Sequence, residues 1–142
     1  MRDYEIENLV FNRVARRLRE EFSGIYVVGE LPQSFAKFPA VSFMQTNKAV
    51  YQPSITDDVE NAVALTFDAR VYSNKVSGKK SEAKEIVAVI DEEMTGMNFV
   101  CIMNSPVTNL ADAKIYQIIA RYTGKVIAIK NGEDTTYMVY AK

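Results

Sequence analysis

The stretch from residue 60 to residue 72, ENAVALTFDARVY, constrains the fold of this chain more than any other. Apolar residues occupy alternate positions, at Val63, Leu65, Phe67, Ala69 and Val71, with Thr66, Asp68 and Arg70 between them. Because successive side chains of a strand point to opposite faces, this alternation predicts a long strand with one buried face and one polar face. It lies midway between two segments of helical periodicity, residues 3–22 and 81–94. The sequence therefore predicts a central strand that supports both helices.

Length and charge limit the class of protein. The 142 residues fit one domain, spanning residues 1–142, and the 17 basic and 18 acidic residues give a formal net charge of −1. Proteins that hold nucleic acid through its phosphates normally carry a basic excess, so non-specific nucleic-acid binding is not expected. Cys101 is the single cysteine and cannot form an internal disulfide. The sequence contains no apolar run of membrane-spanning length and no signal-peptide core at its start, so we expect a soluble protein that stays where it is made.

The remaining elements follow from periodicity and from turn residues. A first helix is predicted to end at Ser23-Gly24, and Ser81 is expected to cap a second helix that ends at Gly96. Further strands are predicted at residues 25–28, 40–44, 99–103 and 113–122, with a turn at residues 123–125 into 126–129, and a last strand at 135–140 after Asn131-Gly132. The order α-β-β-β-α-β-β-β predicts an α+β fold: a single, mostly antiparallel sheet with both helices on one face.

Residues 45–59 are predominantly polar and are predicted to form a protruding loop or hairpin arm. Connections of this length are uncommon in compact domains unless they have a function. The arm contains Tyr51, Gln52, Pro53, Ile55, Asp57 and Asp58. Tyrosine is enriched at protein interfaces, and Tyr51, Tyr137 and Tyr140 lie where a core does not obviously need them. The last strand is expected either to pair within its own sheet or to add to the edge of a neighbouring sheet.

The residues that usually carry catalysis are scarce. The chain has no histidine and one cysteine, so zinc sites and Ser-His or Cys-His nucleophilic systems lack their ligands or base. Two carboxylate groups, Asp57-Asp58 and Asp91-Glu92-Glu93, remain as candidates for a hydrolase or a magnesium site. The helical spacing of the second group is typical of a solvated face. We therefore expect no catalytic residues, no metal and no cofactor.

Charged side chains on the first helix and the central strand favour structural roles. Arg16 with Glu20 and Arg17 with Glu21 have the i,i+4 spacing of helical ion pairs, although this band of residues is also compatible with contact to an acidic protein surface. Asp68 and Arg70 share one face of the central strand. They are expected to pair with each other, across strands, or with a second subunit.

Four segments together resemble the tail terminator (tail-completion) family of long-tailed bacteriophages and related tail-like particles. The first segment is the first helix followed by Phe38-Pro39-Ala40-Val41-Ser42-Phe43, and the second is the strand end Phe67-Asp68-Ala69-Arg70-Val71-Tyr72-Ser73-Asn74. The third is the Gly78-Lys79-Lys80 turn, which leads into a helix that ends before Met97-Asn98-Phe99. The fourth combines residues 105–112 with residues 120–127. The resemblance covers roughly residues 1 to 127. It differs from the family pattern in two respects: Gln117 stands near a position where an arginine is expected, and residues 128–142 form an additional C-terminal hairpin.

The resemblance implies a structural protein of the virion and not an enzyme. Proteins of this family form a ring, typically six-fold, on the head-proximal end of the tail tube, where the ring ends tube polymerisation and joins the head connector. DNA passes through the lumen without specific binding, and no membrane is involved. Assembly takes place in the cytoplasm of the bacterial host. By this resemblance, residues 46–59 are expected to contact the tail tube protein or a neighbouring subunit, and Arg70 and Arg121 to form ion pairs between subunits.

Three alternatives are also compatible with the sequence. A head-closure or connector adaptor protein of the same virion neck would use similar surfaces with a different partner. A small hydrolase would use Asp57, Asp58 or the carboxylates at residues 91–93. A small-ligand binding module would need a deep apolar pocket.

Overall fold

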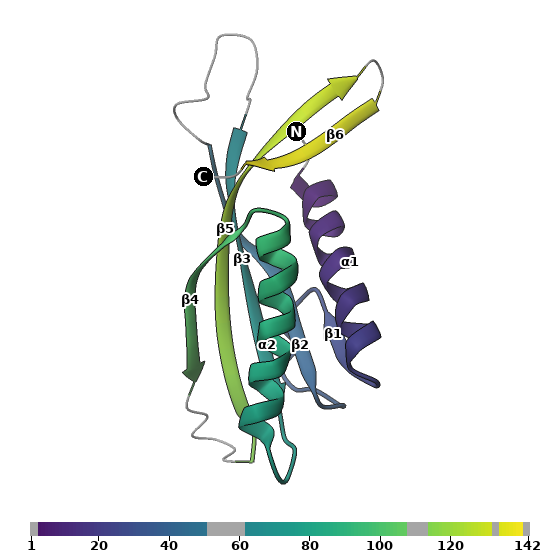
Figure 1. Ribbon diagram of the computed structural model, residues 1–142, viewed down its shortest axis with the longest axis vertical. Helices are drawn as coiled ribbons and strands as arrows, with labels where there is room; N and C mark the ends of the chain where they lie inside the picture. The colour runs from purple at the N-terminus through teal and green to yellow at the C-terminus, as the bar shows by residue number, and fades with distance from the viewer. Residues whose placement is uncertain (1–2, 51–61, 108–113, 132–133, 141–142) are drawn as a thin grey trace.

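The computed structural model describes residues 3–50, 62–107, 114–131 and 134–140, and side chains only within residues 6–49, 63–107 and 114–126. Two helices and six strands follow one another in the predicted order, α-β-β-β-α-β-β-β (Figure 1). They are α1 (Asp3–Glu21), β1 (Tyr26–Val28), β2 (Ala40–Val50), β3 (Ala62–Ser73), α2 (Lys79–Gly96), β4 (Val100–Val107), β5 (Tyr116–Asn131) and β6 (Asp134–Tyr140). Neither helix in this part of the chain is long and apolar enough to span a membrane.

One sheet contains all six strands. Its order is β1-β2-β3-β5-β4, and β6 pairs with β5 beyond the end of this path. β1 runs parallel to β2, whereas the other pairings are antiparallel, so the sheet is mixed. Both helices lie on one face of the sheet (Figure 1). The predicted α+β class and the placement of the helices are therefore confirmed.

β3 is the central strand, as its alternation predicts. The apolar residues Val63, Leu65, Phe67, Ala69 and Val71 are all fully buried beneath the helices. Phe67 lies at the middle of this row, stacked on Phe43 of β2 and edge-on to Phe99, with ring centroids 5.4 Å apart in both pairs. Rings from β2, from β3 and from Phe99, which directly precedes the strand beginning at Val100, thus fix the position of β3 in the core.

The helices bury the faces that their periodicity predicts, but the expected ends of α2 are wrong. Ser81 lies inside the helix, which begins at Lys79 after Gly78, a residue in the left-handed conformation with φ of 95°. At the other end, Gly96 is still helical, and Asn98 adopts the left-handed conformation, with φ of 68°. Asparagine tolerates the left-handed conformation better than most residues do. Asn98 therefore takes the position after the helix that the sequence predicted for Gly96.

Several strands are longer than predicted. β2 continues to Val50 instead of ending at residue 44, and β4 runs through Ser105-Pro106, which looked like a loop. The turn expected at residues 123–125 does not form, because β5 continues through these positions. Gly124 is buried and pairs with Leu65, so the flexible residue that suggested a turn lies within an unbroken ladder against β3.

Candidate assembly surface

The face of the sheet without helices carries at its centre an ion pair whose carboxylate is buried. Arg121 of β5 donates from Nε to Asp68 Oδ1 at 2.8 Å and from Nη2 to Asp68 Oδ2 at 3.0 Å. The side chain of Asp68 is 2% exposed, whereas that of Arg121 is 40% exposed. Thr46 Oγ1 lies 3.5 Å from Oδ1 of the same carboxylate. The guanidinium and its neighbours thus shield the carboxylate from solvent, and the ion pair joins the two central strands within one chain.

Arg70 lies on the same face, two residues from Asp68, next to Tyr72. Burial raises the pKa of the Tyr72 phenol, and the nearby charge of Arg70 partly opposes this rise. Gln117, near the position where the family pattern expects an arginine, donates from Nε2 to the Tyr72 hydroxyl at 3.2 Å. The ring of Phe35 covers Tyr72, with centroids 4.6 Å apart, so the connection before β2 shields this end of the face.

The other predicted interface residues are described only in part. Residues 51–61, which include Tyr51, Gln52, Pro53, Ile55, Asp57 and Asp58, lie outside the described residues. Tyr137 and Tyr140 belong to β6, opposite Ala128 and Lys125 of β5, and their side chains are not described. The arm and the tyrosines of the hairpin therefore stay predictions.

The two helices are joined by an ion-pair network that spacing along one helix does not predict. Arg17 contacts Glu21 of its own helix at 3.1 Å, which confirms the expected i,i+4 pair. Its other guanidinium nitrogens contact Glu92 at 2.8 Å and Glu93 at 3.2 Å on α2, and Arg13 contacts Glu93 at 2.9 Å. Two of the three candidate catalytic carboxylates near the end of α2 are thus bound to arginines of α1.

These contacts determine the ionisation of the network. Burial alone would raise the pKa of Glu93, but the guanidinium groups of Arg13 and Arg17 outweigh it and hold this pKa below its ordinary value. Hydrogen bonds to Glu93, Glu21 and Glu92 raise the pKa of Arg17. Glu93 is therefore a charged partner for both arginines at neutral pH.

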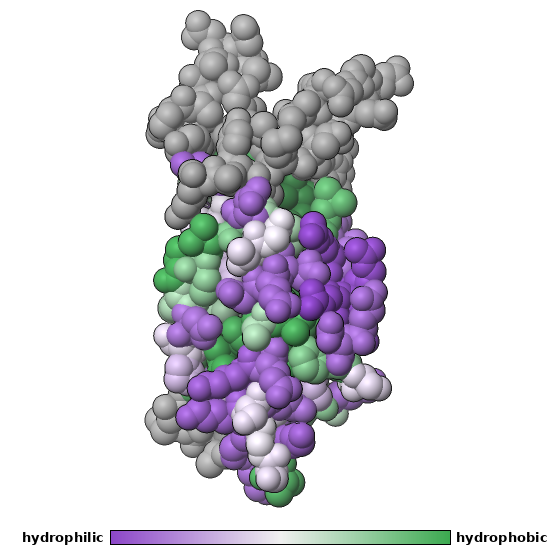
Figure 2. All heavy atoms as spheres, in the orientation of Figure 1, coloured by the Kyte–Doolittle hydropathy of each residue, from purple (hydrophilic) through white to green (hydrophobic). Residues whose placement is uncertain are grey.

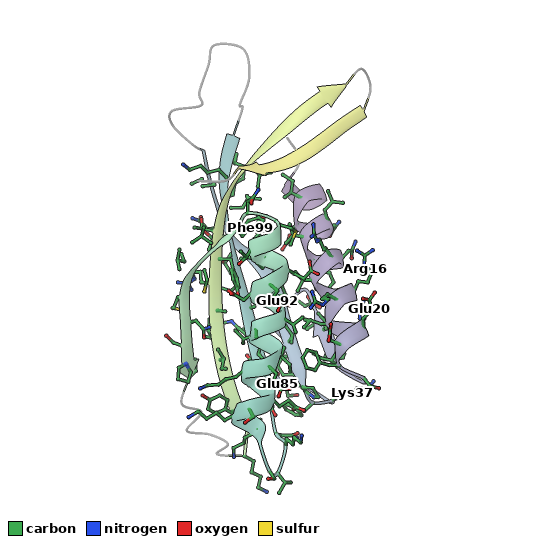
Figure 3. The ribbon with its side chains drawn as sticks, in the orientation of Figure 1. Arg16, Glu20, Lys37, Glu85, Glu92 and Phe99 are labelled. Carbon is green, nitrogen blue, oxygen red and sulfur yellow. The ribbon has the colours of Figure 1, made fainter. Side chains whose placement is uncertain are left out.

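Arg16 and Glu20 lie on the outer side of α1 (Figure 3), and no ion pair joins them among the described residues, so this part of the prediction is wrong. Both side chains are exposed. They therefore remain accessible on the outer surface of the helix layer.

A groove with a volume of about 760 Å³ runs between α2 and the edge strand β4, and we call it the α2–β4 groove. It is lined by Lys80, Lys84, Val87, Ala88 and Asp91 of α2, Cys101, Asn104 and Pro106 of β4, and Tyr116 and Ile118 of β5. Figure 2 shows hydrophobic surface along the β4 flank beside the hydrophilic surface of the helices. Asp91, the third carboxylate of the predicted cluster, therefore faces a different surface from Glu92 and Glu93.

A buried tyrosine lies beneath one end of this groove. The Tyr122 hydroxyl is fully buried, and no described group meets the geometry of a full hydrogen bond with it, although the Asp91 carboxylate lies near enough to interact. Its pKa lies above the ordinary tyrosine value, first because of burial and then because of the negative charge of nearby Asp91. Burial also raises the pKa of the Cys101 thiol, which is half-buried beside it. Both groups are thus neutral at physiological pH.

We expect Tyr122→Phe to raise the free energy of unfolding by about 1 kcal/mol, because the variant no longer buries a hydroxyl whose approach to Asp91 falls short of hydrogen-bond geometry. The effect should also depend on pH. The native tyrosine holds its proton above the unfolded-state pKa of about 10, so the wild type should lose stability as pH rises beyond that value. Urea unfolding of both proteins measures these effects at two pH values: pH 7, and about 10.5, which is above the unfolded-state pKa of tyrosine. Equal stability of the two proteins at both values would contradict the prediction.

No protein-family model matches this chain, and a search of curated proteins finds no significant match. The resemblance to tail terminators therefore depends on the residue patterns given above.

Proposed function

We propose that this protein is a structural component of a phage or phage-like tail, forming a six-membered ring on the head-proximal end of the tail tube. In this role the ring ends polymerisation of the tube and provides the surface that joins the head. The tail tube protein and the head–tail connector are its partners, and DNA passes through the lumen. The proposal places the protein in the virion neck.

The observation that most supports this function is the extension of two strand pairs past the helix layer. β2 and β3 pair as far as Val50 and Val63, and β5 and β6 pair from Lys125 to Asn131. Figure 1 shows the β5–β6 hairpin projecting beyond the ends of both helices. Strands that leave their own core present backbone groups and side chains to other chains, which favours an assembly role.

Shortening the arm tests the proposed function. Replacing residues 52–57 with a two-residue linker should leave a folded protein that no longer caps tail tubes, because the proposed contact with the tube is gone. The measurement is the length distribution of tubes assembled from purified tail tube protein, seen by negative-stain microscopy. Wild type should stop growth at one end, whereas the shortened variant should not.

The control is Val76→Ser, which changes a fully exposed residue in the turn before α2. Circular dichroism and urea unfolding should show that both variants fold like the wild type. If the shortened variant limits tube growth as well as the wild type does, the proposed role of the arm is wrong.

A further inference from the structure

The α2–β4 groove lies beside β4, which is an edge strand of the described sheet. β4 pairs with β5 on one side, and no other described strand pairs with it. Edge strands are commonly protected by charged residues, but Val100–Val107 contains none. Its protection consists of Pro106 and a bulge between Cys101 and Met103, and Ile102 beside this bulge is 55% exposed. The groove and edge therefore offer apolar surface to a partner.

The β5–β6 hairpin is a two-stranded ribbon that requires another surface to cover it. Its strands pair with each other, and it leans over α1, away from the β4 flank (Figure 1). The sequence of the hairpin is apolar at consecutive positions, in Val126-Ile127-Ala128-Ile129 and in Tyr137-Met138-Val139-Tyr140. Since consecutive strand positions face opposite ways, both faces of this two-stranded ribbon are predicted to be apolar. Such a ribbon is marginally stable unless other surfaces cover it.

Charge complementarity favours this hairpin as the occupant of the groove. Lys80 and Lys84 are exposed, one helical turn apart, on the α2 wall of the groove. β6 begins at Asp134, an acidic residue at the projecting end of the hairpin. Opposite charges at the rim of an interface set its register and exclude wrong arrangements.

We propose that the β5–β6 hairpin of one subunit packs across the α2–β4 groove of the next copy, with Asp134 beside Lys84. This inference rests on the proposed ring and names the contact between its subunits. The hairpin and the groove lie on opposite flanks of the molecule, so the contact is head-to-tail. Repetition of a head-to-tail contact closes into a ring when the rotation between subunits permits.

A charge exchange tests the contact. Lys84→Asp and Asp134→Lys should each raise the protein concentration needed for half-assembly by about tenfold, because each places like charges together. The double variant should assemble within about threefold of the wild type, since the ion pair is restored in reverse. Light scattering over a concentration range, with tail tubes added as template in a second series, gives these values. Lys37→Asp, at an exposed lysine on the connection before β2, is the matched control and should assemble like the wild type.

Disulfide trapping provides a second measurement that does not depend on charge. Ala88 is exposed in the groove one helical turn from Lys84. In a Cys101→Ala background, Ala88→Cys with Asp134→Cys should give a ladder of linked subunits on oxidation, and each single cysteine should not. Circular dichroism confirms that the background folds.

The outcomes separate this inference from the proposed function. If rings form but the charge variants assemble normally and no ladder appears, the hairpin–groove contact is overturned and the ring proposal stands. If the wild type stays monomeric both alone and with tail tubes, both proposals are overturned. Weakened assembly in the single variants, recovery in the double variant and a ladder would together support the contact.

Discussion

Replacing Phe67 with alanine is expected to lower the free energy of unfolding by about 4 kcal/mol. Phe67 is fully buried at the centre of β3, in contact with Phe43 and Phe99 at ring separations of 5.4 Å. The substitution removes the transfer free energy of a whole ring and leaves a cavity that two flanking aromatic rings cannot easily fill. Urea unfolding at pH 7 followed by circular dichroism measures the loss.

Phe67→Leu and Val76→Ala are the controls for this prediction. Leucine keeps part of the volume, so Phe67→Leu should cost less than half as much as the alanine variant. Val76 is fully exposed in the turn before α2, and its truncation should change the stability by no more than about 0.5 kcal/mol. A loss below about 1 kcal/mol for Phe67→Ala would mean that β3 does not organise the core as described.

The success of the sequence prediction for β3 has a simple physical cause. Hydrophobic alternation over the whole strand is a local signal, and the register of a strand with one buried face is strongly specified by it. Both helices were predictable for the same reason, since Ile86, Val87 and Ile90 repeat at helical spacing on the buried side of α2. These elements bury apolar surface along most of their length, so local pattern and tertiary packing agree.

The errors arose where tertiary contacts override local preference. Gly124 suggested a turn, but pairing with β3 keeps β5 extended through that position. Pro106 suggested a loop, although prolines are tolerated in edge strands such as β4, where a missing amide donor has no ladder partner to lose. In both cases the neighbouring strand decided the conformation, and a single-sequence pattern does not contain that information.

The candidate surfaces were even less accessible from sequence. The contacts of Arg17 with Glu92 and Glu93 join residues 75 and 76 positions apart, so no spacing rule finds them. The α2–β4 groove likewise requires knowing that β4 lies at the sheet edge. By contrast, the polar face of β3 was visible, and Asp68 on that face was a named candidate. Its partner Arg121, 53 residues away, was also singled out, but as a contact between subunits.

Arg121→Met is expected to reduce the ratio of folded to unfolded protein by roughly 100-fold. Methionine keeps most of the volume of the side chain but removes the two nitrogens that bind the carboxylate of Asp68. Because that carboxylate is buried, the variant leaves it with Thr46 Oγ1, at 3.5 Å, as its remaining hydrogen-bond contact among the described side chains. Urea unfolding at pH 7 measures the change.

The double variant Asp68→Leu/Arg121→Met distinguishes loss of the ion pair from loss of packing. It should recover most of the stability, because it removes the buried carboxylate together with its partner, and replacing such a pair by apolar residues of similar volume is often neutral. Arg70 lies on the same face, two residues from Asp68. The free energy of unfolding of Arg70→Met should lie within about 0.5 kcal/mol of the wild-type value. Equal losses for Arg121→Met and Arg70→Met would show that Asp68 does not depend on Arg121.

The same comparison bears on assembly, because Arg70 and Arg121 were both expected to form ion pairs between subunits. Arg121 already binds both carboxylate oxygens of Asp68 within its own chain, so a second acidic partner would have to compete with a bidentate contact. Arg70 lies beside the neutral phenol of Tyr72, and no ion pair within the described part of the chain holds its guanidinium. Arg70→Met should therefore weaken ring assembly while leaving the fold intact, whereas Arg121→Met should act on assembly only through loss of the fold.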